Sequence, residues 1–497
     1  MIPQTDLDPD YLLRFDVEGV LNEEICLLNE RHKVDLELWN VPEASHLWNF
    51  NLHYFEYCIP LAAKWSDTGD NRYWLCFKRL VESWIAACEY PLGDGWHPYT
   101  ISLRLVNWLV CRELFEPMLS TDAEFDKMLL DSMYAQYRHL AINQETHLLA
   151  NHYFENLKAL VICSKLFGDD CEFERSWRNL EGQLEEQILQ DGVHFERSLM
   201  YHKLVLEGIL RISFVLRQID GSEPEILRTK ASSMLDAMVS LEKGMGKTPF
   251  FNDSADGVSK SCSQLSAACL SIFQLEACDA VADFPFAGYY KLYSDDGRFA
   301  LMVDVGEPGP PYMLGHSHCD ALSFELSVDG VPVIINSGTY GYQSELRSYF
   351  RSTAAHNTVQ YGSCEQMQCW GEHRVASSYE SCSVVERSGN LIRAVLTLRN
   401  GIRLERCIQF RADSLVISDT AVNGADECLV SRIHIASGNR LDAVSSDSQM
   451  NVEQQVASRE FGLLENVETL VFKSSDSIVC SIDCASLRQY VVGKDIG

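Results

Sequence analysis

ALSFELSVDGVPVIIN, residues 321–336, is the stretch that decides how the second half of the chain folds. It consists of two short strand-like runs, and the pair Asp329 and Gly330 separates them. Apolar residues that alternate with polar ones are typical of a strand with one buried face, and an Asp-Gly pair between two such runs is typical of a tight turn. The stretch therefore predicts an antiparallel hairpin.

Similar runs lie on both sides of this hairpin, with no helical pattern between them. They are RFALMVDV (298–305), AVLTLRN (394–400), RLERCIQF (403–410), DSLVISDTAV (413–422) and CLVSRIHIA (428–436). Many short strands joined by turns are typical of an antiparallel β-sandwich. We therefore expect a β-sandwich domain over residues 286–497.

The earlier part of the chain has a different period. Segments such as YFENLKALVICSKLF (153–167) and YHKLVLEGILRISFVL (201–216) repeat apolar residues three and four apart, which is the pattern of amphipathic helices. Short polar breaks separate these segments. Residues 46–285 are therefore expected to form antiparallel helix hairpins, either as a bundle or as a ring of α/α pairs. Residues 1–45 are a polar, partly helical lead-in.

The composition limits the partners and the location of the protein. A net charge of −30 argues against nonspecific nucleic-acid binding, which needs Lys and Arg to neutralise phosphates. It does not argue against a polyanionic substrate, because salt screens exposed charges beyond about 10 Å. The 18 cysteines are scattered without a CxxC pair, which favours a reducing compartment. With no signal peptide or membrane span visible, we expect a cytoplasmic protein, or a periplasmic or secreted one if a leader was removed.

Three histidines are the first candidates for chemistry. His316 and His318 lie two residues apart in GHSHCDALSFEL (315–326) and so project from the same side of an extended segment, and His356 follows in RSTAAHNTV (351–359). Imidazoles are costly to bury unpaired and serve in proton transfer or metal ligation near neutral pH. The alternative is that neighbouring backbone groups satisfy all three rings.

Two groups in the helical half are further candidates. Asn151 and Glu155 lie four residues apart on one helix face beside His152, although an N-cap asparagine with a surface histidine would give the same pattern. Tyr201 begins an amphipathic helix, where a tyrosine is more often a packing residue. Its polar neighbours in sequence are Glu196, Arg197 and His202.

Aromatic and polar residues near the start of the helical half form a third group. Trp48, Asn51, His53 and Trp96 can line a sugar cleft, since aromatic rings stack on pyranose faces, but the tryptophans can equally belong to the core. Arg104 lies in an apolar run, which favours a paired or ligand-facing guanidinium over a surface one.

Five motifs, taken in order, resemble those of the heparinase II/III-like polysaccharide lyases, which include glycosaminoglycan and oligoalginate lyases. They are NHYFENL (151–157), ERSLMYH (196–202), GHSHCDALSFEL (315–326), NSGTY (336–340) and RSYFRSTAAHNTV (347–359). The resemblance spans about Trp48 to Trp370. It implies an incomplete α/α toroid followed by an antiparallel β-sandwich, with an active site in the cleft between them. It also implies β-elimination, in which a uronate loses its C5 proton and the C4–oxygen bond breaks.

The resemblance also implies roles for single residues. Asn151, with His152 or His316, neutralises the uronate carboxylate, and Tyr201 serves as base, acid or both, with His152 as its partner when the proton lies on the opposite face. Glu155 is expected to orient His152. An unperturbed tyrosine is a poor base near neutral pH, so Arg197, His202 and His316 are expected to lower its pKa. The residues expected to bind substrate are Trp48, Asn51, His53, Trp96, Arg104, Glu155, Arg197, His202 and Arg351.

His318 and His356 match metal ligands of the family. The third family ligand is usually an aspartate, and here it is Asn336. The loss of that negative charge weakens the case for zinc, and manganese or calcium are the alternatives, because an amide oxygen can still bind a hard ion.

The leading hypothesis is a lyase that depolymerises a uronate-containing polysaccharide or oligosaccharide, namely hyaluronan, chondroitin sulfate, heparan sulfate or alginate. One alternative is a glycoside hydrolase that uses two carboxylates across a sugar cleft. The other is a noncatalytic carbohydrate-binding or polysaccharide-biosynthesis accessory protein that keeps the fold.

Overall fold

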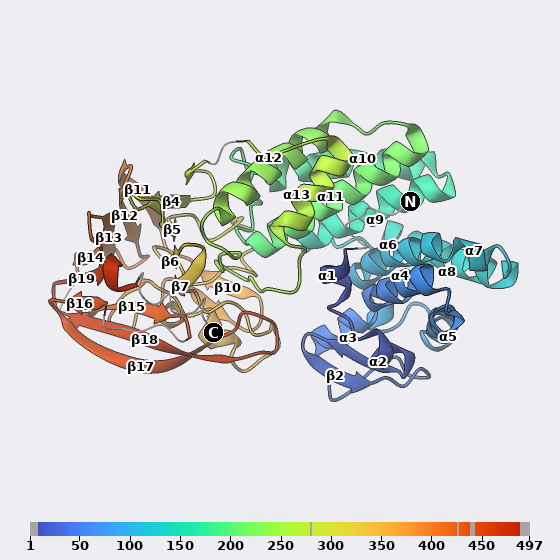
Figure 1. Cartoon of the computed structure of the whole chain (residues 1–497), viewed down its shortest axis with the longest axis horizontal. Helices are drawn as coiled ribbons and strands as arrows, with labels where there is room; N and C mark the ends of the chain where they lie inside the picture. The colour runs from blue at the N-terminus through green and yellow to red at the C-terminus, as the bar shows by residue number, and fades with distance from the viewer. Residues whose placement is uncertain (1–7, 279–280, 425–426, 438–442, 488–497) are drawn as a thin grey trace. The chain divides into compact units, whose positions relative to one another are not determined.

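A computed structural model describes residues 8–278, 281–424, 427–437 and 443–487, and the chain divides into two units (Figure 1). The first unit comprises Met1–Gln187, Leu204–Ser232 and Ser263–Glu276, and the second comprises Ile188–Lys203, Ser233–Cys262 and Ala277–Gly497. The β-rich part of the chain therefore shares its unit with two segments of the helical part. The single boundary expected at residue 285 stays a prediction, and the expected domain ends at residues 1–7 and 488–497 lie outside the described residues.

The first unit is built mainly from helices, with a small hairpin of β1 (Glu24–Leu27) and β2 (Glu30–Lys33) near its start. Its helices are α1 (Pro9–Leu12), α2 (Val17–Leu21), α3 (His46–Leu52), α4 (Ile59–Thr68), α5 (Asn71–Ala87), α6 (Pro98–Leu114), α7 (Glu116–Leu119), α8 (Ala123–Ile142), α9 (Ala150–Phe167), α10 (Asp170–Gln187) and most of α13 (Cys262–Phe273). Two further helices, α11 (Leu199–Asp220) and α12 (Glu225–Glu242), have residues in both units. Within the first unit, α6 contacts α4, α8 and α9, and α9 also contacts α8 and α10.

Helix α9 is an interior helix of this unit. It is buried on nearly every face between Ala150 and Ser164, whereas α5 buries only one stripe of aromatic and aliphatic side chains. A helix that is hydrophobic all round belongs in a core. Helix α9 ends at Gly168, whose φ of 67° suits a glycine C-cap. Polar side chains at the buried start of this helix lose contact with water, which packing alone does not favour. Their position there therefore indicates a functional role.

The second unit contains two antiparallel sheets. The larger has the order β17-β18-β15-β7-β6-β5-β4-β3, with β8 also paired to β15, and the smaller has the order β11-β12-β13-β14-β19-β16. The bounds are β3 (Asp283–Phe284), β4 (Tyr289–Tyr293), β5 (Phe299–Asp304), β6 (Phe324–Val328), β7 (Val331–Ile334), β8 (Val359–Tyr361), β9 (Gln368–Trp370), β10 (Arg374–Ser377), β11 (Ser381–Ser388), β12 (Leu391–Thr397), β13 (Arg403–Phe410), β14 (Ser414–Val422), β15 (Leu429–Ile435), β16 (Val444–Ser446), β17 (Gln449–Ala457), β18 (Glu465–Ser474) and β19 (Ser477–Asp483). Strands β9 and β10 form a separate ribbon.

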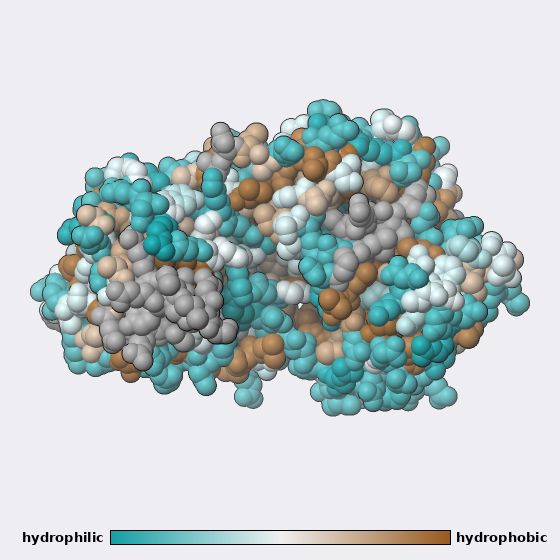
Figure 2. Space-filling view, viewed as in Figure 1, coloured by the Kyte–Doolittle hydropathy of each residue, from teal (hydrophilic) through white to brown (hydrophobic). Residues whose placement is uncertain are grey.

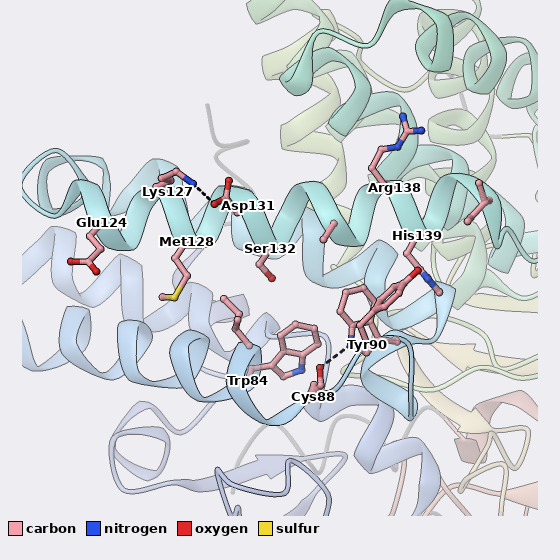
Figure 3. Close-up of a pocket in the computed structure, with 14 residues that line it drawn as sticks. Trp84, Cys88, Tyr90, Glu124, Lys127, Met128, Asp131, Ser132, Arg138 and His139 are labelled. Carbon is pink, nitrogen blue, oxygen red and sulfur yellow. Dashed lines mark hydrogen bonds and ion pairs between the residues drawn. The ribbon is translucent and has the colours of Figure 1, made fainter.

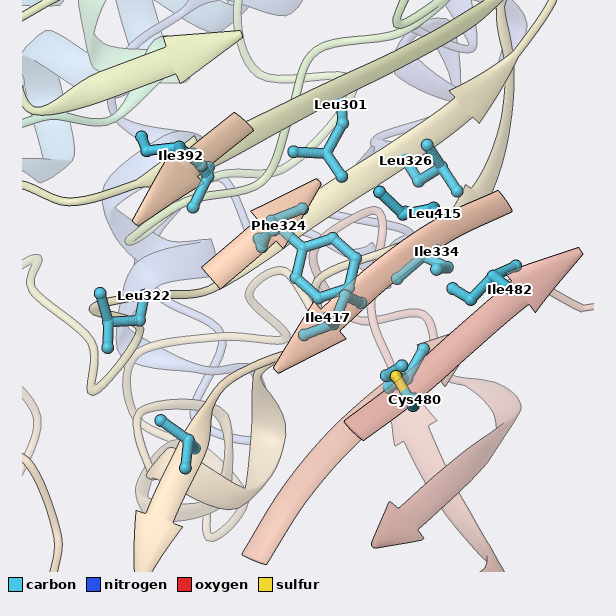
Figure 4. Packing of buried hydrophobic residues seen from close by; sticks show 14 of the residues in the cluster. Leu301, Leu322, Phe324, Leu326, Ile334, Ile392, Leu415, Ile417, Cys480 and Ile482 are labelled. Atoms are coloured by element: carbon cyan, nitrogen blue, oxygen red, sulfur yellow. The ribbon is translucent and has the colours of Figure 1, made fainter. Parts of the chain in front are cut away.

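The predicted hairpin is confirmed as β6 and β7, which pair antiparallel. Asp329 and Gly330 at its turn have φ of 50° and 78°, as a type I′ turn requires. One core joins the two sheets: Leu326 of the larger sheet and Ile417 of the smaller belong to the same buried cluster (Figure 4). The expectation of a helical part followed by an antiparallel β-sandwich is thus confirmed.

A second core attaches helical segments to the sandwich. Val193 and Leu199, together with Leu241 near the end of α12, are buried against Tyr289 and Met302 of strands β4 and β5. Each such side chain contributes roughly 1.5–3 kcal/mol when it is fully buried. The segment that carries Tyr201 is therefore fixed to the unit that carries the histidine motif.

The surface is a mixture of hydrophilic and hydrophobic residues. On the face shown in Figure 2, hydrophobic residues form separate patches between hydrophilic ones. Among the described residues, none of the helices combines the length and the apolar character needed to span a bilayer.

Candidate active site

Asp253 lies between the two histidines of the GHSH motif. His316 Nδ1 is 2.9 Å from Asp253 Oδ2, and His318 Nε2 is 2.8 Å from Oδ1. The carboxyl group is fully buried. Because an ionised carboxylate only accepts hydrogen bonds, the proton of His316 lies on Nδ1 and that of His318 on Nε2. Asp253, which the sequence analysis did not single out, therefore fixes the tautomer of both rings.

Arg347 keeps Asp253 ionised. Its Nη2 donates to Asp253 Oδ2 at 2.7 Å, its Nη1 donates to Oδ1, and the Thr339 hydroxyl donates to the same Oδ1 at 3.2 Å. Burial alone would raise the pKa of Asp253. Arg347 and the two histidines outweigh that effect and hold the pKa well below its ordinary value. The carboxylate therefore stays charged near neutral pH.

Tyr201 lies against this network in the first turn of α11. Its ring centre is 4.3 Å from that of His316, with the planes inclined at 44°, and its hydroxyl is 2.7 Å from the hydroxyl of Tyr342. The Arg347 guanidinium lies 5.2 Å from the centre of the Tyr342 ring. A phenol pair, an imidazole and a guanidinium thus meet within the second unit, as candidates for proton transfer should.

Strained backbone supports these positions. Arg197 and Asn252, which are not glycines, have φ of 54° and 56°. Asn252 links the segment that carries Arg197 to the segment that carries His318. Its Nδ2 donates to the Arg197 carbonyl at 3.1 Å, and its Oδ1 accepts from the His318 amide at 3.0 Å. Such conformations cost free energy and cluster at functional sites. Here they lie just before Tyr201 and Asp253.

The expected metal ligands His318, His356 and Asn336 lie together. The two rings are 5.2 Å apart, and Asn336 Oδ1 is 3.3 Å from His356 Nδ1. His356 Nε2 donates to the Phe350 carbonyl at 3.1 Å, so its Nδ1 holds a lone pair. His318 Nδ1 is buried and has no hydrogen-bond partner among the described residues.

The protonation states of these two histidines suit a metal. Burial lowers the pKa of His318 to about 4 despite Asp253, and burial holds the pKa of His356 well below its ordinary value. Both rings are therefore neutral at physiological pH. Two imidazole lone pairs and an amide oxygen in a buried place fit a divalent cation.

A second group of possible ligands overlaps the first network. Ligand atoms of Asp253, His316 and His373 lie within 4.8 Å of one another and could hold a metal ion. Arg347 already donates to both oxygens of Asp253, so a cation there would compete with a guanidinium. We therefore regard this group as part of the proton-transfer network.

Asn151 and His152 lie in the first unit, in the first turn of α9. Leu149 and Ala150 before them have φ of 59° and 52°, and no side chain caps the helix at Leu149. Asn151 is buried. The local strain holds the start of this interior helix in one fixed arrangement, as the neighbourhood of a functional residue would require.

The partner of His152 differs from the expected one. His152 Nδ1 lies 2.9 Å from Glu145 Oε1, whereas Glu155 forms an ion pair with Lys158 one turn along the helix. The prediction that Glu155 orients His152 is therefore wrong. Glu145 lies in the loop before α9, and nothing in the local sequence pattern marks it.

Two residues expected to bind substrate belong to the core of the first unit. Arg104 is fully buried and donates to Gln136 Oε1 and to the His53 carbonyl, both at 2.9 Å, and its guanidinium lies 4.0 Å from the Trp84 ring centre. His53 Nδ1 accepts from Trp84 Nε1 at 3.1 Å, and burial lowers the pKa of His53 to about 3. Both side chains therefore have partners inside the first unit, and their expected contact with substrate stays a prediction.

Trp48 and Asn51 also have partners inside the protein. Trp48 is fully buried, and its Nε1 donates to the Glu30 carbonyl at 3.1 Å. Asn51 is half-buried, and its Nδ2 donates to the Leu47 carbonyl at 2.9 Å within α3. The burial of Trp48 agrees with the alternative of a core tryptophan, while Asn51 keeps part of its side chain accessible. The contact of both residues with substrate stays a prediction.

Trp96 lines a cavity of about 770 Å³ between the end of α5 and α8. Figure 3 shows this cavity, with Trp84 below α8 and Tyr90 beside His139 of α8. The Trp96 Nε1 donates to the Cys88 carbonyl at 3.0 Å. The predicted contact of Trp96 with substrate remains a prediction.

His202 and Arg197 serve the structure of the second unit. His202 is fully buried: its Nδ1 accepts from the His194 amide at 3.2 Å, and its Nε2 lies 2.9 Å from the Met234 carbonyl. Burial lowers the pKa of His202 to about 3. The Arg197 guanidinium donates to backbone carbonyls, including that of Phe286 at 3.2 Å. The expected contact of these two residues with substrate stays a prediction.

Arg351 stabilises the loop that carries the histidine motif. It is buried, its Nε donates to the Ser317 carbonyl at 3.1 Å, and its own carbonyl accepts from the Cys319 amide at 3.0 Å. These contacts hold the loop that carries His316 and His318, and the expected contact of Arg351 with substrate stays a prediction.

Models of two protein families match the chain. The model described as heparinase II/III N-terminus matches residues 20–277, and the model described as heparinase II/III-like, C-terminal matches residues 279–486. A heparin-sulfate lyase of Pedobacter heparinus is 21% identical over 362 residues, which cover 66% of this chain and 53% of that protein. The chain therefore matches about half the length of this relative.

Solved structures share the fold. A crystal structure of heparinase III matches with a TM-score of 0.79 at 15% identity over 97% of this chain and 85% of that one. The chondroitin AC lyase of Streptomyces coelicolor A3 matches with a TM-score of 0.58 at 9% identity over 99% and 81%. These likenesses confirm the expected incomplete α/α toroid followed by a β-sandwich.

Proposed function

The chain belongs to the heparinase II/III family, and we propose that it is a polysaccharide lyase that cleaves uronate-containing glycans by β-elimination. The proposed substrates are glycosaminoglycans such as heparan sulfate, chondroitin sulfate and hyaluronan, with alginate as a further uronate polymer. The observation that carries this proposal is the meeting of Tyr201 with His316, whose tautomer Asp253 fixes.

The reaction requires a group that can take and return a proton. A base removes the C5 proton, the electron pair of that bond forms the C4–C5 double bond, and the C4–oxygen bond breaks as the leaving oxygen takes up a proton. In this proposal Tyr201 takes the first proton and supplies the second. Tyr342 can donate a hydrogen bond to the Tyr201 oxygen. The positive charge of Arg347 favours the ionised form of the Tyr201 hydroxyl.

The uronate carboxylate must be neutralised before the C5 proton can leave. Hydrogen-bond donors do this best when they strengthen as charge develops in the transition state. We assign this work to His316, whose ring orientation Asp253 fixes, and to the amide of Asn151. The structure supports the first assignment by geometry and the second by the strained, buried start of α9.

Incubation with a panel of polysaccharides tests the proposal. Hyaluronan, chondroitin sulfates, heparan sulfate, heparin and alginate are offered separately, and ultraviolet absorbance is followed together with the size of the products. A lyase creates a conjugated double bond and therefore an absorbance that hydrolysis does not produce. Shorter products without that absorbance would favour the hydrolase alternative, and intact polymers throughout would favour a binding protein.

Asn151→Ala should mainly lower kcat, by about tenfold to a hundredfold, because its amide matters most when charge develops on the carboxylate. KM should change little. Steady-state kinetics on the best substrate of the panel measures both constants. A rise in KM at unchanged kcat would show that Asn151 only contributes to ground-state binding.

We further propose that His318, Asn336 and His356 hold a divalent metal, either zinc or a harder ion such as manganese or calcium. Two features support this: His318 Nδ1 has no hydrogen-bond partner in the part of the chain that the structure describes, and the amide oxygen of Asn336 lies beside His356. When bound, the ion would fasten the loops of the sandwich together. The neutral amide of Asn336 makes the proposed site weaker than one with an aspartate.

His318→Ala should lower metal content and Tm together, because the metal binds the folded state only. Asn336→Asp should do the opposite and tighten metal binding by about tenfold, since it restores a charged ligand. Elemental analysis measures the metal content of each variant, and thermal unfolding with and without a chelator measures its Tm. A wild-type protein that takes up no divalent ion and keeps its Tm with chelator would contradict the site.

A further inference from the structure

Glu145 and His152 form a second carboxylate–histidine pair, within the first unit. His152 Nδ1 lies 2.9 Å from Glu145 Oε1, and His97 Nε2 lies 3.9 Å from the same oxygen. The Glu145 side chain is 1% exposed, whereas that of His152 is 31% exposed. A buried carboxylate therefore accepts from a partly exposed histidine here, whereas His316, which pairs with buried Asp253, is itself buried.

Asn156 fixes the other oxygen of Glu145. Its Nδ2 donates to Glu145 Oε2 at 3.0 Å and lies 3.1 Å from the Ser102 hydroxyl. Its Oδ1 accepts from the backbone amide of Glu145 at 2.8 Å. Asn156 lies four residues after His152 on α9, so one helix holds both partners of the carboxylate. Glu145 is thereby held in one orientation.

Glu145 has a different charge balance from Asp253. Its ion pairs among the described residues are with His97 and His152, without a lysine or arginine. Burial would raise the pKa of Glu145, but the hydrogen bond and charge of His152 and the charge of His97 outweigh it and lower that pKa. The carboxylate is therefore ionised at neutral pH and accepts the Nδ1 proton of His152.

We propose that Glu145 is the positioning residue of His152: it keeps the ring proton on Nδ1, so that Nε2 is the atom that acts on the substrate. On a uronate whose C5 proton lies on the face opposite Tyr201, His152 takes that proton on Nε2 in place of Tyr201, and the carboxylate of Glu145 stabilises the imidazolium that forms. The identity of the reaction rests on the proposed lyase function. The tautomer of His152 does not depend on it.

Nitrogen chemical shifts test the tautomer directly. In protein labelled at histidine, the signals of His152 are assigned by their loss in His152→Asn. The wild type should show the Nδ1–H tautomer. In Glu145→Gln, the new amide oxygen should still accept from Asn156, so the amide NH₂ faces His152 Nδ1. Because Nδ1 must then accept a hydrogen bond, the ring should change to the Nε2–H tautomer. Glu172→Gln, another buried glutamate of this unit, should leave His152 unchanged.

The kinetic test uses the same variants. Glu145→Gln should lower kcat by about a hundredfold with little change in KM, as expected when a wrong tautomer faces the substrate. In a His152→Asn background the same change should cost nothing further, because the two residues act as one unit.

Two results would overturn the role of Glu145: an Nε2–H tautomer in the wild type, or full additivity with His152→Asn. A wild type without lyase activity would instead count against the proposed function, and the chemical shifts would still decide the tautomer.

Discussion

Tyr201→Phe should lower kcat by at least about a hundredfold on a glycosaminoglycan substrate and leave the Kd for that substrate within about twofold of the wild-type value. The substitution removes one hydroxyl oxygen. The ring still packs against His316, so the loss reports proton transfer and not a disturbed fold. Initial rates and equilibrium binding to an uncleaved oligosaccharide measure the two effects separately.

Tyr342→Phe is the matched control, because it removes the other hydroxyl of the same 2.7 Å pair. We expect a loss of about tenfold, since Tyr342 supports the Tyr201 oxygen without carrying the proton. A Tyr201→Phe protein with wild-type kcat would exclude Tyr201 as the proton carrier. A larger loss from Tyr342→Phe than from Tyr201→Phe would transfer that role to Tyr342.

Asp253→Asn should destabilise the protein by about 3–5 kcal/mol, because it leaves the buried Arg347 guanidinium without a counter-charge. It should also lower kcat by at least about a hundredfold, because His316 then loses the carboxylate that fixes its tautomer. Urea unfolding measures the free energy of unfolding, and rates per folded molecule measure the second effect.

The double variant Asp253→Asn/Arg347→Met separates stability from catalysis. It removes both charges of the buried pair, so we expect it to recover much of the lost stability and to remain inactive. Asp419→Asn is the matched control, because Asp419 pairs with buried Arg406 inside the sandwich at 2.7 and 2.8 Å. It should cost stability and keep the rate per folded molecule. Recovery of activity in the double variant would contradict the orienting role of Asp253.

The stability that Asp253 contributes should depend on pH. A carboxyl group whose pKa is depressed in the folded state stabilises the fold above its ordinary pKa, and that contribution is lost as pH falls through the depressed value. The difference in unfolding free energy between wild type and Asp253→Asn should therefore be constant near neutral pH and shrink in acid.

Much of the fold could be predicted from the sequence because the local patterns agree with the final structure. The Asp329–Gly330 pair sits in the β6–β7 hairpin, and the fully apolar run of α9 lies in the interior. The motifs also placed Tyr201 and His316 in one family pattern, and the structure brings the two rings together.

Other parts of the site could not be predicted because their partners are distant in sequence. Asp253 is separated by 63 residues from His316 and by 94 from Arg347, and only the folded chain joins them. Glu145 and Glu155 are both acidic residues near His152, and composition does not distinguish the one that turns toward it. Arg104 is a third case: the apolar run predicted a paired or ligand-facing guanidinium, but only the structure shows that its partners include Gln136 and the His53 carbonyl.

Digestion of the preferred polysaccharide in water labelled with the heavy isotope of oxygen, followed by mass spectrometry of the fragments, tests the β-elimination chemistry most directly. Elimination breaks the C4–oxygen bond without adding water. We therefore expect each new non-reducing end to be an unsaturated uronate, one water lighter than the saturated end of a hydrolysis product. The new reducing end should gain heavy oxygen no faster than an undigested oligosaccharide does by exchange with water. Fragments that carry heavy oxygen and a saturated uronate would contradict the lyase chemistry assigned to Tyr201 and His316.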